Sequence, residues 1–332
     1  MHRGKKIQAV ASRVRFFVVL VLAFGLFQVI GAPMAAAEYP EREITMIVPW
    51  AAGGGTDLIT RVLADLMAKD LGKPVVVVNK AGGGGLIGFN TIGSTKPDGY
   101  TIGITTNSQI LQKYSATTYL DWRAFAPIAL HNYDPASFTV KIDSPWKNIK
   151  EAIEYAKANP MKVRVSNSGP GAIWHVAAAL LGSKTGVQFT HVPYGGANPA
   201  AVALAGGHVE ATTASPGEVA TLVKGEKLRI LAIASEKRDP MFPNVPTFKE
   251  SGIDFVFGVW RCLVAPKGTP KEVIAKLEKS AEKAVRDPKF VDFMTKNGFG
   301  QVYHGSAASA AIMAQDEKDM EKIVPILGLK KE

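Results

Sequence analysis

The chain has 332 residues, of which 47% are hydrophobic and 8% aromatic, and this length suits one large globular domain or two medium ones. Its formal net charge is +10, but no basic run carries interleaved aromatic residues, which argues against a nucleic-acid partner. The single cysteine, Cys262, excludes an internal disulfide.

The first 37 residues have the layout of a cleaved secretory signal peptide. Five basic residues precede an apolar run from Phe16 to Ile30, and Ala35 to Ala37 are small residues suited to cleavage before Glu38. The apolar core is short for a membrane span, although an uncleaved anchor is the alternative. Cleavage removes five positive charges and leaves a net charge of +5. An exported chain without disulfides is typical of the bacterial periplasm.

Strand and helix signals alternate along the rest of the chain. The first part predicts strands and helices at 44–48, 56–71, 75–78, from Leu86 onward, and 100–105. The β-branched run at 75–78 is typical of a strand that is buried on both faces.

The same alternation restarts near residue 140. A helix is predicted to begin at Ser144-Pro145 and to end at Asn159-Pro160. Further elements are predicted at 163–166, 172–181, 188–192, 209–213 and 229–234, with an alanine-rich helix before the fourth of them. A strand at 255–265, a helix that a capping box at Thr269 opens and that ends near Arg286, and a helix at 308–323 complete the pattern. Alternating strands and helices indicate an α/β fold, and the restart indicates two domains.

Three glycine-rich turns precede predicted helices, at Ala52 to Thr56, Gly82 to Gly85 and Ser168 to Gly171. A helix N-terminus presents unpaired N–H groups and a partial positive charge, and glycine lets an anion approach them closely. Open α/β sheets bind ligands at the carboxyl ends of their strands. The three turns therefore predict a site for a carboxylate or a phosphate.

Other readings of these residues are weaker. Gly83 to Gly88 matches the spacing of a dinucleotide-binding turn, but the next strand ends at Thr106 without the required carboxylate. No phosphate-loop motif with its lysine is present, and the six histidines are scattered, so neither a cofactor nor a metal is expected. Ser168 and His175 could suggest a hydrolase, but no nucleophile-elbow motif surrounds the serine.

Seven segments extend this picture over almost the whole mature chain, from Tyr39 to Leu329. They are YPEREITMIVPWAAGGGTD, LGKPVVVVNKAGGGGLIG, KPDGYTIGI, HVPYGGANPA, KLRILAIAS, FPNVPTF and LVAPKGTP. In order and spacing they resemble the substrate-binding receptors of tripartite tricarboxylate transporters, also called Bordetella uptake (Bug) proteins. The resemblance implies a type II periplasmic binding protein fold, in which two α/β domains joined by two crossing hinge strands close on one ligand.

The resemblance also implies an assignment of domains and partners. Domain 1 would comprise residues 38–139 and 256–332, and domain 2 residues 140–255. The protein would be a monomeric periplasmic receptor, without catalytic activity, for a mono-, di- or tricarboxylate. It would deliver the ligand to a membrane permease with a small and a large integral subunit.

The expected ligand-binding residues follow from the three turns and the segments around them. They are Trp50, Ala52, Gly53, Gly54, Thr56, Asp57, Ala81, Gly82, Gly83, Gly84, Ser108, Ser168, Gly169, Gly171, Trp174, His175 and Ser215. Asp57 is expected to support its turn by capping backbone N–H groups, because its charge would repel a carboxylate ligand.

Several residues depart from the family pattern. Ala172-Ile173-Trp174 stand where small hydroxyl residues are common, which favours a di- or monocarboxylate with an apolar body. Ser215 replaces a frequent asparagine, and Arg261-Cys262 replace an aromatic residue and glycine. Arg261 is either a second carboxylate anchor or a solvated hinge-surface residue. We favour the solvated interpretation, because most arginines are exposed.

Two other functional classes stay open at this point. One is a secreted α/β hydrolase that uses Ser168 and His175. The other is a sensor that presents the same ligand to a signalling receptor. The identity of the ligand is not encoded in any of these motifs, because backbone recognition of a carboxylate says little about the rest of the molecule.

Overall fold

The computed structural model describes residues 38–115 and 120–327, and the predicted signal peptide lies outside them. The chain divides into residues 1–41 and residues 42–332, and every helix and strand named below belongs to the second unit. Within the described residues, no helix combines the length and the apolar content needed to cross a membrane.

The first sheet has six strands in the order β11-β4-β10-β3-β1-β2. They are β1 (Ile44–Val48), β2 (Val75–Asn79), β3 (Thr101–Thr106), β4 (Phe125–Pro135), β10 (Gly258–Pro266) and β11 (Gln301–Gly305). β1 is parallel to β2 and β3, whereas β10 is antiparallel to both β3 and β4. The carboxyl ends of the three parallel strands therefore meet at one edge.

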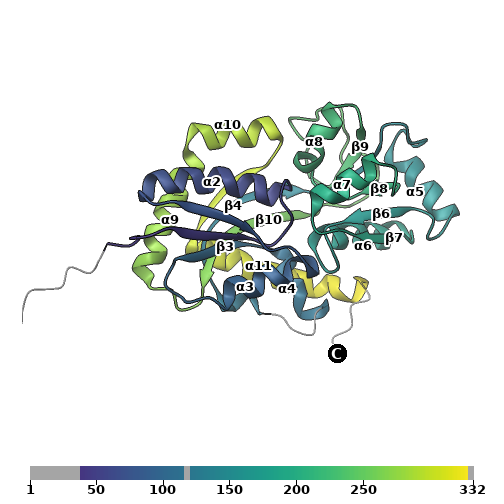
Figure 1. Ribbon diagram of the computed structural model, residues 1–332. Coiled ribbons are helices and arrows are strands. Elements are labelled where there is room, and N and C mark those ends of the chain that lie inside the picture. Colours follow the sequence, from purple (N-terminus) through teal and green to yellow (C-terminus); the bar gives the residue numbers. More distant parts are fainter. Residues whose placement is uncertain (1–37, 116–119, 328–332) are drawn as a thin grey trace, which may run out of the picture. The chain divides into compact units, whose positions relative to one another are not determined.

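Helices cover both faces of this sheet (Figure 1). One group comprises α2 (Gly55–Leu71), α9 (Lys271–Arg286) and α10 (Pro288–Asn297), and the other comprises α3 (Leu86–Gly93), α4 (Asn107–Ser115) and α11 (Ser306–Ile323). Short 3₁₀ turns lie at Gly83–Gly85, Trp122–Ala124 and Val324–Leu327. α2 ends at Gly72, whose left-handed backbone (φ 68°) stops the helix where the sequence predicts it.

The second sheet has five strands in the order β7-β6-β8-β5-β9. They are β5 (Ser137–Lys141), β6 (Arg164–Asn167), β7 (Thr190–Pro193), β8 (Ala211–Thr212) and β9 (Leu228–Ile233). Its helices are α5 (Ile149–Ala158), α6 (Ile173–Thr185), α7 (Ala197–Ala205) and α8 (Pro216–Lys224). Figure 1 shows α7 and α8 on one side of these strands and α6 on the other.

We call each sheet with its helices a lobe, the first built on the six-stranded sheet and the second on the five-stranded one. The chain crosses between the lobes twice. β4 passes through Ala136 into β5, and the return path leads from β9 to β10. The two crossings are bonded together, because the Ala136 N–H donates to Phe257 O at 2.8 Å and the Ala234 N–H donates to Ala136 O at 2.8 Å. This is the predicted two-lobed α/β fold with two connecting strands.

Some local predictions are wrong. β2 is the edge strand, and Val76 is 40% exposed, so this run is not buried on both faces. α5 begins at Ile149, because Asn148 caps it by accepting the Glu151 N–H at 3.1 Å. Thr269 does not cap α9, since its hydroxyl donates to the carbonyl of the preceding turn.

Two kinds of feature have no counterpart in the sequence prediction. The unpredicted elements are β4, β5, β11, α4, α8 and α10. In addition, β5 begins at Ser137, so three residues that the prediction assigns to the first domain pair in the second sheet.

Candidate functional site

The glycine turns of the two lobes lie against one another. The Ala51 N–H donates to Gly195 O at 3.0 Å, and the Asn198 side-chain amide donates to Ala52 O at 3.2 Å. A Cβ added to Gly169 would lie 3.0 Å from the Gly84 backbone. The site is therefore formed largely by main chain of both lobes, including a turn at Tyr194 to Ala197 that the sequence analysis did not place in it.

The first turn, between β1 and α2, is organised by Asp57. Its buried carboxylate accepts the Gly53 N–H at 2.9 Å, the Asn79 amide at 2.9 Å and the Arg61 guanidinium at 3.0 and 2.8 Å. Burial alone would raise the pKa of Asp57, but the bonds from Arg61, Gly53 and Asn79 together hold it below its ordinary value. The negative charge of Asp57 is therefore balanced by donors of the first lobe.

The second turn, between β2 and α3, depends on glycine. All four residues from Gly82 to Gly85 have positive φ angles, of 133°, 57°, 64° and 104°. Gln112 donates to Gly84 O at 3.2 Å. A Cβ on Gly84 would collide with the carbonyl oxygen of Pro170 in the second lobe. Only glycine gives both this backbone conformation and this close approach.

The third turn, between β6 and α6, opens a helix of the second lobe. The Ile173 N–H donates across the lobes to Ser108 Oγ at 2.9 Å, and the Gly171 N–H donates to His175 Nδ1 at 3.2 Å. Burial lowers the pKa of His175, which keeps Nδ1 able to accept. His191 packs edge-on against His175, with ring centroids 4.7 Å apart, and burial lowers its pKa to about 4.

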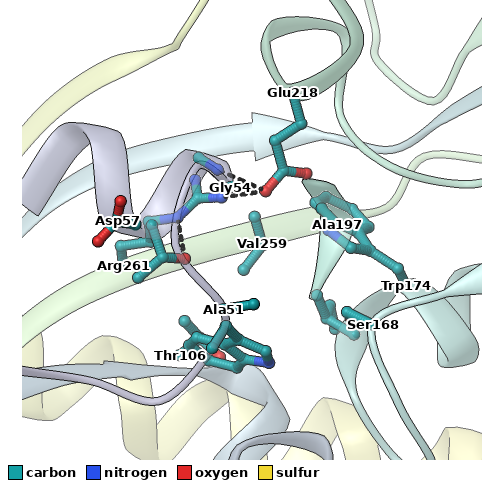
Figure 2. A pocket seen from close by; sticks show the side chains of 14 residues that line it. Ala51, Gly54, Asp57, Thr106, Ser168, Trp174, Ala197, Glu218, Val259 and Arg261 are labelled. Carbon is teal, nitrogen blue, oxygen red and sulfur yellow. Dashed lines mark hydrogen bonds and ion pairs between the residues drawn. The ribbon is translucent and has the colours of Figure 1, made fainter. Parts of the chain in front are cut away.

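Two adjoining pockets lie among the turns. The Arg261 pocket lies between the lobes (Figure 2) and is lined by Trp50, Ala51, Gly54, Gly55, Thr56, Asp57, Thr106, Ser168, Ile173, Trp174, Ala197, Glu218, Val259 and Arg261. Its cavity volume is about 20 Å³, which suffices for about one water molecule. The lobes therefore leave little free space above the first turn.

The second cavity, which we call the Gly84 pocket, is larger. On the same measure its volume is about 250 Å³, and it is lined by Trp50, Gly82 to Gly85, Ser168, Gly169, Pro170, Pro193, Tyr194 and Gly195. Trp50 and Ser168 line both pockets. Trp50 is 8% exposed, and its buried indole N–H has no hydrogen-bond partner among the described residues, which is unusual for a buried polar group.

Arg261 is not solvated, which corrects the interpretation favoured from the sequence. It is 1% exposed, on β10. Its Nε donates to Thr56 Oγ1 at 2.8 Å, and Nη1 donates to Asn132 Oδ1 and Asp134 Oδ2. Nη2 donates to Glu218 Oε1 at 3.2 Å, and Glu218 lies in the second lobe. Burial raises the pKa of Glu218, although Arg261 acts against this rise.

The predicted site residues fall into two groups. Those that line a pocket are Trp50, Gly54, Thr56, Asp57, Gly82, Gly83, Gly84, Ser168, Gly169 and Trp174. Those that line neither pocket are Ala52, Gly53, Ala81, Ser108, Gly171, His175 and Ser215. Most of the second group hold the turns in place through the bonds given above, and Ser215 does the same for α8 by donating to Glu218.

Sequence reasoning missed Glu218 as a pocket residue. A signal for its helix cap was present, because Ser215 and Glu218 have the spacing of a capping box. That signal predicts the start of α8, but it does not predict that Glu218 contacts the first lobe.

Ser168 and His175 do not form a nucleophile–base pair. Ser168 lines both pockets, but His175 lines neither, and no hydrogen bond joins the two side chains. Nδ1 of the histidine is already used by Gly171. Residues 38–115 and 120–327 also contain no group of three or more His, Cys, Asp or Glu residues that could hold a metal ion.

Comparison with known proteins adds to this geometry. Residues 59–329 match the family model for the tripartite tricarboxylate transporter family receptor. The solved structure of periplasmic binding protein BugD is similar with a TM-score of 0.85 and 35% identity, over 89% of this chain and 100% of that chain.

Two solved structures from Rhodopseudomonas palustris contain ligands. MatC with bound malate is 27% identical, with a TM-score of 0.82 over 86% of this chain and 100% of its own. Rpa4515 with adipate is 25% identical, with a TM-score of 0.84 over 88% of this chain and 99% of its own.

Proposed function

The chain belongs to the tripartite tricarboxylate transporter receptor family, and on that premise we propose that it captures an organic carboxylate between its lobes in the periplasm. It then presents the loaded form to a permease with a small and a large integral subunit. The two lobes act as the two domains expected from the sequence, residues 38–139 with 256–332 and residues 140–255, except that residues 137–139 belong to the second lobe. They rotate about the two crossings.

The observation that carries this proposal is the convergence of glycine turns from both lobes on the two pockets. The turns at Gly54 and Ser168 each lead into a helix that begins at the Arg261 pocket. Helix N-termini and glycine N–H groups favour a carboxylate without any basic side chain. Trp50 lines both pockets, and its indole N–H, which lacks a partner within residues 38–115 and 120–327, would add one more donor if a bound ligand reached it.

The side chains around the turns favour a particular class of carboxylate. Trp50, Ile173, Trp174 and Val259 form an apolar wall of the Arg261 pocket. Such a wall suits a di- or monocarboxylate with an apolar body, because the anion binds main chain while the body packs on aromatic rings. The relatives that hold malate and adipate support a dicarboxylate as the first choice.

A thermal-shift screen of residues 38–332 tests the proposal. The panel contains mono-, di- and tricarboxylates, with sugars, amino acids and phosphate as controls. A ligand at one hundred times its Kd adds about 2.7 kcal/mol to the free energy of unfolding, which corresponds to a rise in Tm of several degrees. Stabilisation by one class of carboxylate is the expected result. Stabilisation by a sugar or phosphate alone would refute the proposed ligand class.

A second assay separates the receptor from a secreted hydrolase. The wild type and Ser168→Ala are incubated with a chromogenic ester. The receptor hydrolyses none, and turnover that Ser168→Ala abolishes would overturn the proposal.

A further inference from the structure

One carboxylate reaches from the second lobe onto the first glycine turn. Glu218, near the start of α8, accepts the Gly55 N–H at 3.2 Å and the Arg261 guanidinium at 3.2 Å through the same oxygen, Oε1. Figure 2 shows Glu218 pointing from the second lobe toward Gly54 and Arg261. Glu218 thus accepts a hydrogen bond from a backbone N–H at the N-terminus of α2. A helix N-terminus favours an anion at this place.

The first-lobe half of this contact is held in place by its own lobe. Arg261 lies on β10 and is bonded to Thr56 on α2 and to Asn132 and Asp134 on β4. These four residues all belong to the six-stranded sheet and its helices. The guanidinium therefore keeps its position, and most of its hydrogen bonds, whether or not the second lobe is in contact.

The second-lobe half is equally well held. Glu218 Oε2 accepts the backbone N–H of Ser215 at 3.1 Å and its hydroxyl at 3.2 Å, which is the reciprocal part of a capping box. One oxygen of the carboxylate thus fixes α8, and the other is left for the first lobe. Separation of the lobes would break the two bonds of Oε1 and leave those of Oε2 intact.

The energetics suit a contact that forms and breaks. Glu218 and Arg261 are both buried, with side chains 3% and 1% exposed, and Asp134 adds a second carboxylate beside the guanidinium. Desolvation of a buried ion pair cancels much of its Coulombic attraction, so the contact favours closed lobes without locking them, whereas removing one partner alone is costly. When the lobes separate, Glu218 regains water and Arg261 keeps Asp134 as its counter-ion.

We propose that Glu218 forms an interlobe bridge, which we define as its contact with Gly55 and Arg261, and that this bridge holds the lobes together before a ligand arrives. The inference rests on the proposed function, in which the lobes move. While the bridge is formed it occupies the Gly55 N–H, so a ligand's carboxylate has to use the other main-chain donors of the turns. Glu218 is thus a specificity-determining residue that restricts the charge a ligand can place there.

Two variants of residues 38–332 test the bridge. Glu218→Gln keeps the size of the side chain and a residue type that capping boxes accept, but places an uncharged amide against Gly55 and Arg261. Gly55→Ala adds a Cβ that would lie 2.9 Å from Arg261 Nη2 and from Glu218 Cγ and Oε1. Alanine is the better helix former at this helical position, so this variant is expected to fold.

The matched control is Glu210→Gln. This carboxylate lies in the second lobe, and it bonds Arg164 of the same lobe at 2.6 Å. The measurement is small-angle X-ray scattering of the ligand-free proteins, with urea unfolding to verify that each variant is folded.

We expect the wild type and Glu210→Gln to have the radius of gyration of a compact chain of this length, roughly 19 Å. Glu218→Gln and Gly55→Ala should both shift to a larger radius than these two proteins, because the lobes separate. Unchanged radii in both folded variants would overturn the bridge. Expansion of Glu218→Gln alone would also overturn it, because the effect would then belong to the cap of α8. The experiment contains no ligand, so a failure of carboxylates to bind would refute the proposed function and leave this result standing.

Discussion

Replacing Asp57 with asparagine should loosen the first glycine turn by a predictable amount. The carboxylate accepts hydrogen bonds from Gly53, Asn79 and Arg61, with two from the guanidinium. An amide has one acceptor oxygen, so its NH₂ group would face two donors, one of them charged. A lost bond to a charged group costs about 1.5–3 kcal/mol and a neutral one about 1 kcal/mol. We expect the free energy of unfolding to fall by about 2–3 kcal/mol. The fall stays below the sum of the separate bonds because Arg61 is half exposed and regains water.

Urea unfolding followed by circular dichroism measures this loss. The matched control is Asp65→Asn on the same helix. The exposed carboxylate of Asp65 forms surface ion pairs with Lys69 and Lys289. This variant should therefore lose less than about 1 kcal/mol of the free energy of unfolding. Because the folded pKa of Asp57 is depressed, its contribution is complete above its unfolded pKa and is lost as the pH falls through the lower folded value. The free energies of unfolding of the two variants should therefore approach each other in acid. Equal stability of Asp57→Asn and Asp65→Asn at neutral pH would refute the reasoning.

Three further predictions address the pockets and the C-terminal helix. Gly84→Ala should weaken carboxylate binding at least tenfold in calorimetry, because its Cβ meets the Pro170 carbonyl; unchanged affinity would show that these turns do not meet in the complex. Trp50→Phe removes one donor that has no partner among the described residues and should cost about 1 kcal/mol of binding, with urea unfolding to verify that the variant is folded. The bond from Arg123 holds the pKa of Glu317 at about 2, so Glu317→Gln should lose about 2 kcal/mol above pH 4.5. That loss should fade toward pH 2, and a pH-independent difference in urea unfolding would contradict it.

Local rules account for the parts of the fold that could be predicted. β1, α2 and β3 follow from apolar runs that a glycine or a turn ends, and the geometry of each is decided within a few residues. The second turn was equally predictable, because a run of positive φ angles from Gly82 to Gly85 admits little besides glycine.

β4 could not be recognised in the same way. It carries His131, Asn132 and Asp134, which are polar residues that a strand of the core rarely contains. Burial of Asn132 and Asp134 is compensated by their hydrogen bonds with Arg261 on the neighbouring strand. A pattern of apolar residues cannot predict a strand whose interior is polar for this reason.

Arg261 and Glu218 were missed for a related reason. They are separated by 43 positions in the sequence and meet only where the lobes touch. An ion pair across two lobes leaves no spacing or composition signal, and the general tendency of arginine to be solvated gives the wrong answer here.

The position of Arg261 along β10 also has a mechanical consequence. Gly258 begins this strand next to the crossing at Ala136 and Phe257, and Arg261 follows three residues later, about 10 Å along the strand. A contact this near the pivot has a short lever arm, so a given rotation displaces it less than it displaces contacts at the rim. Opening should therefore begin at the outer turns and reach Arg261 last, and closing should run in the opposite order.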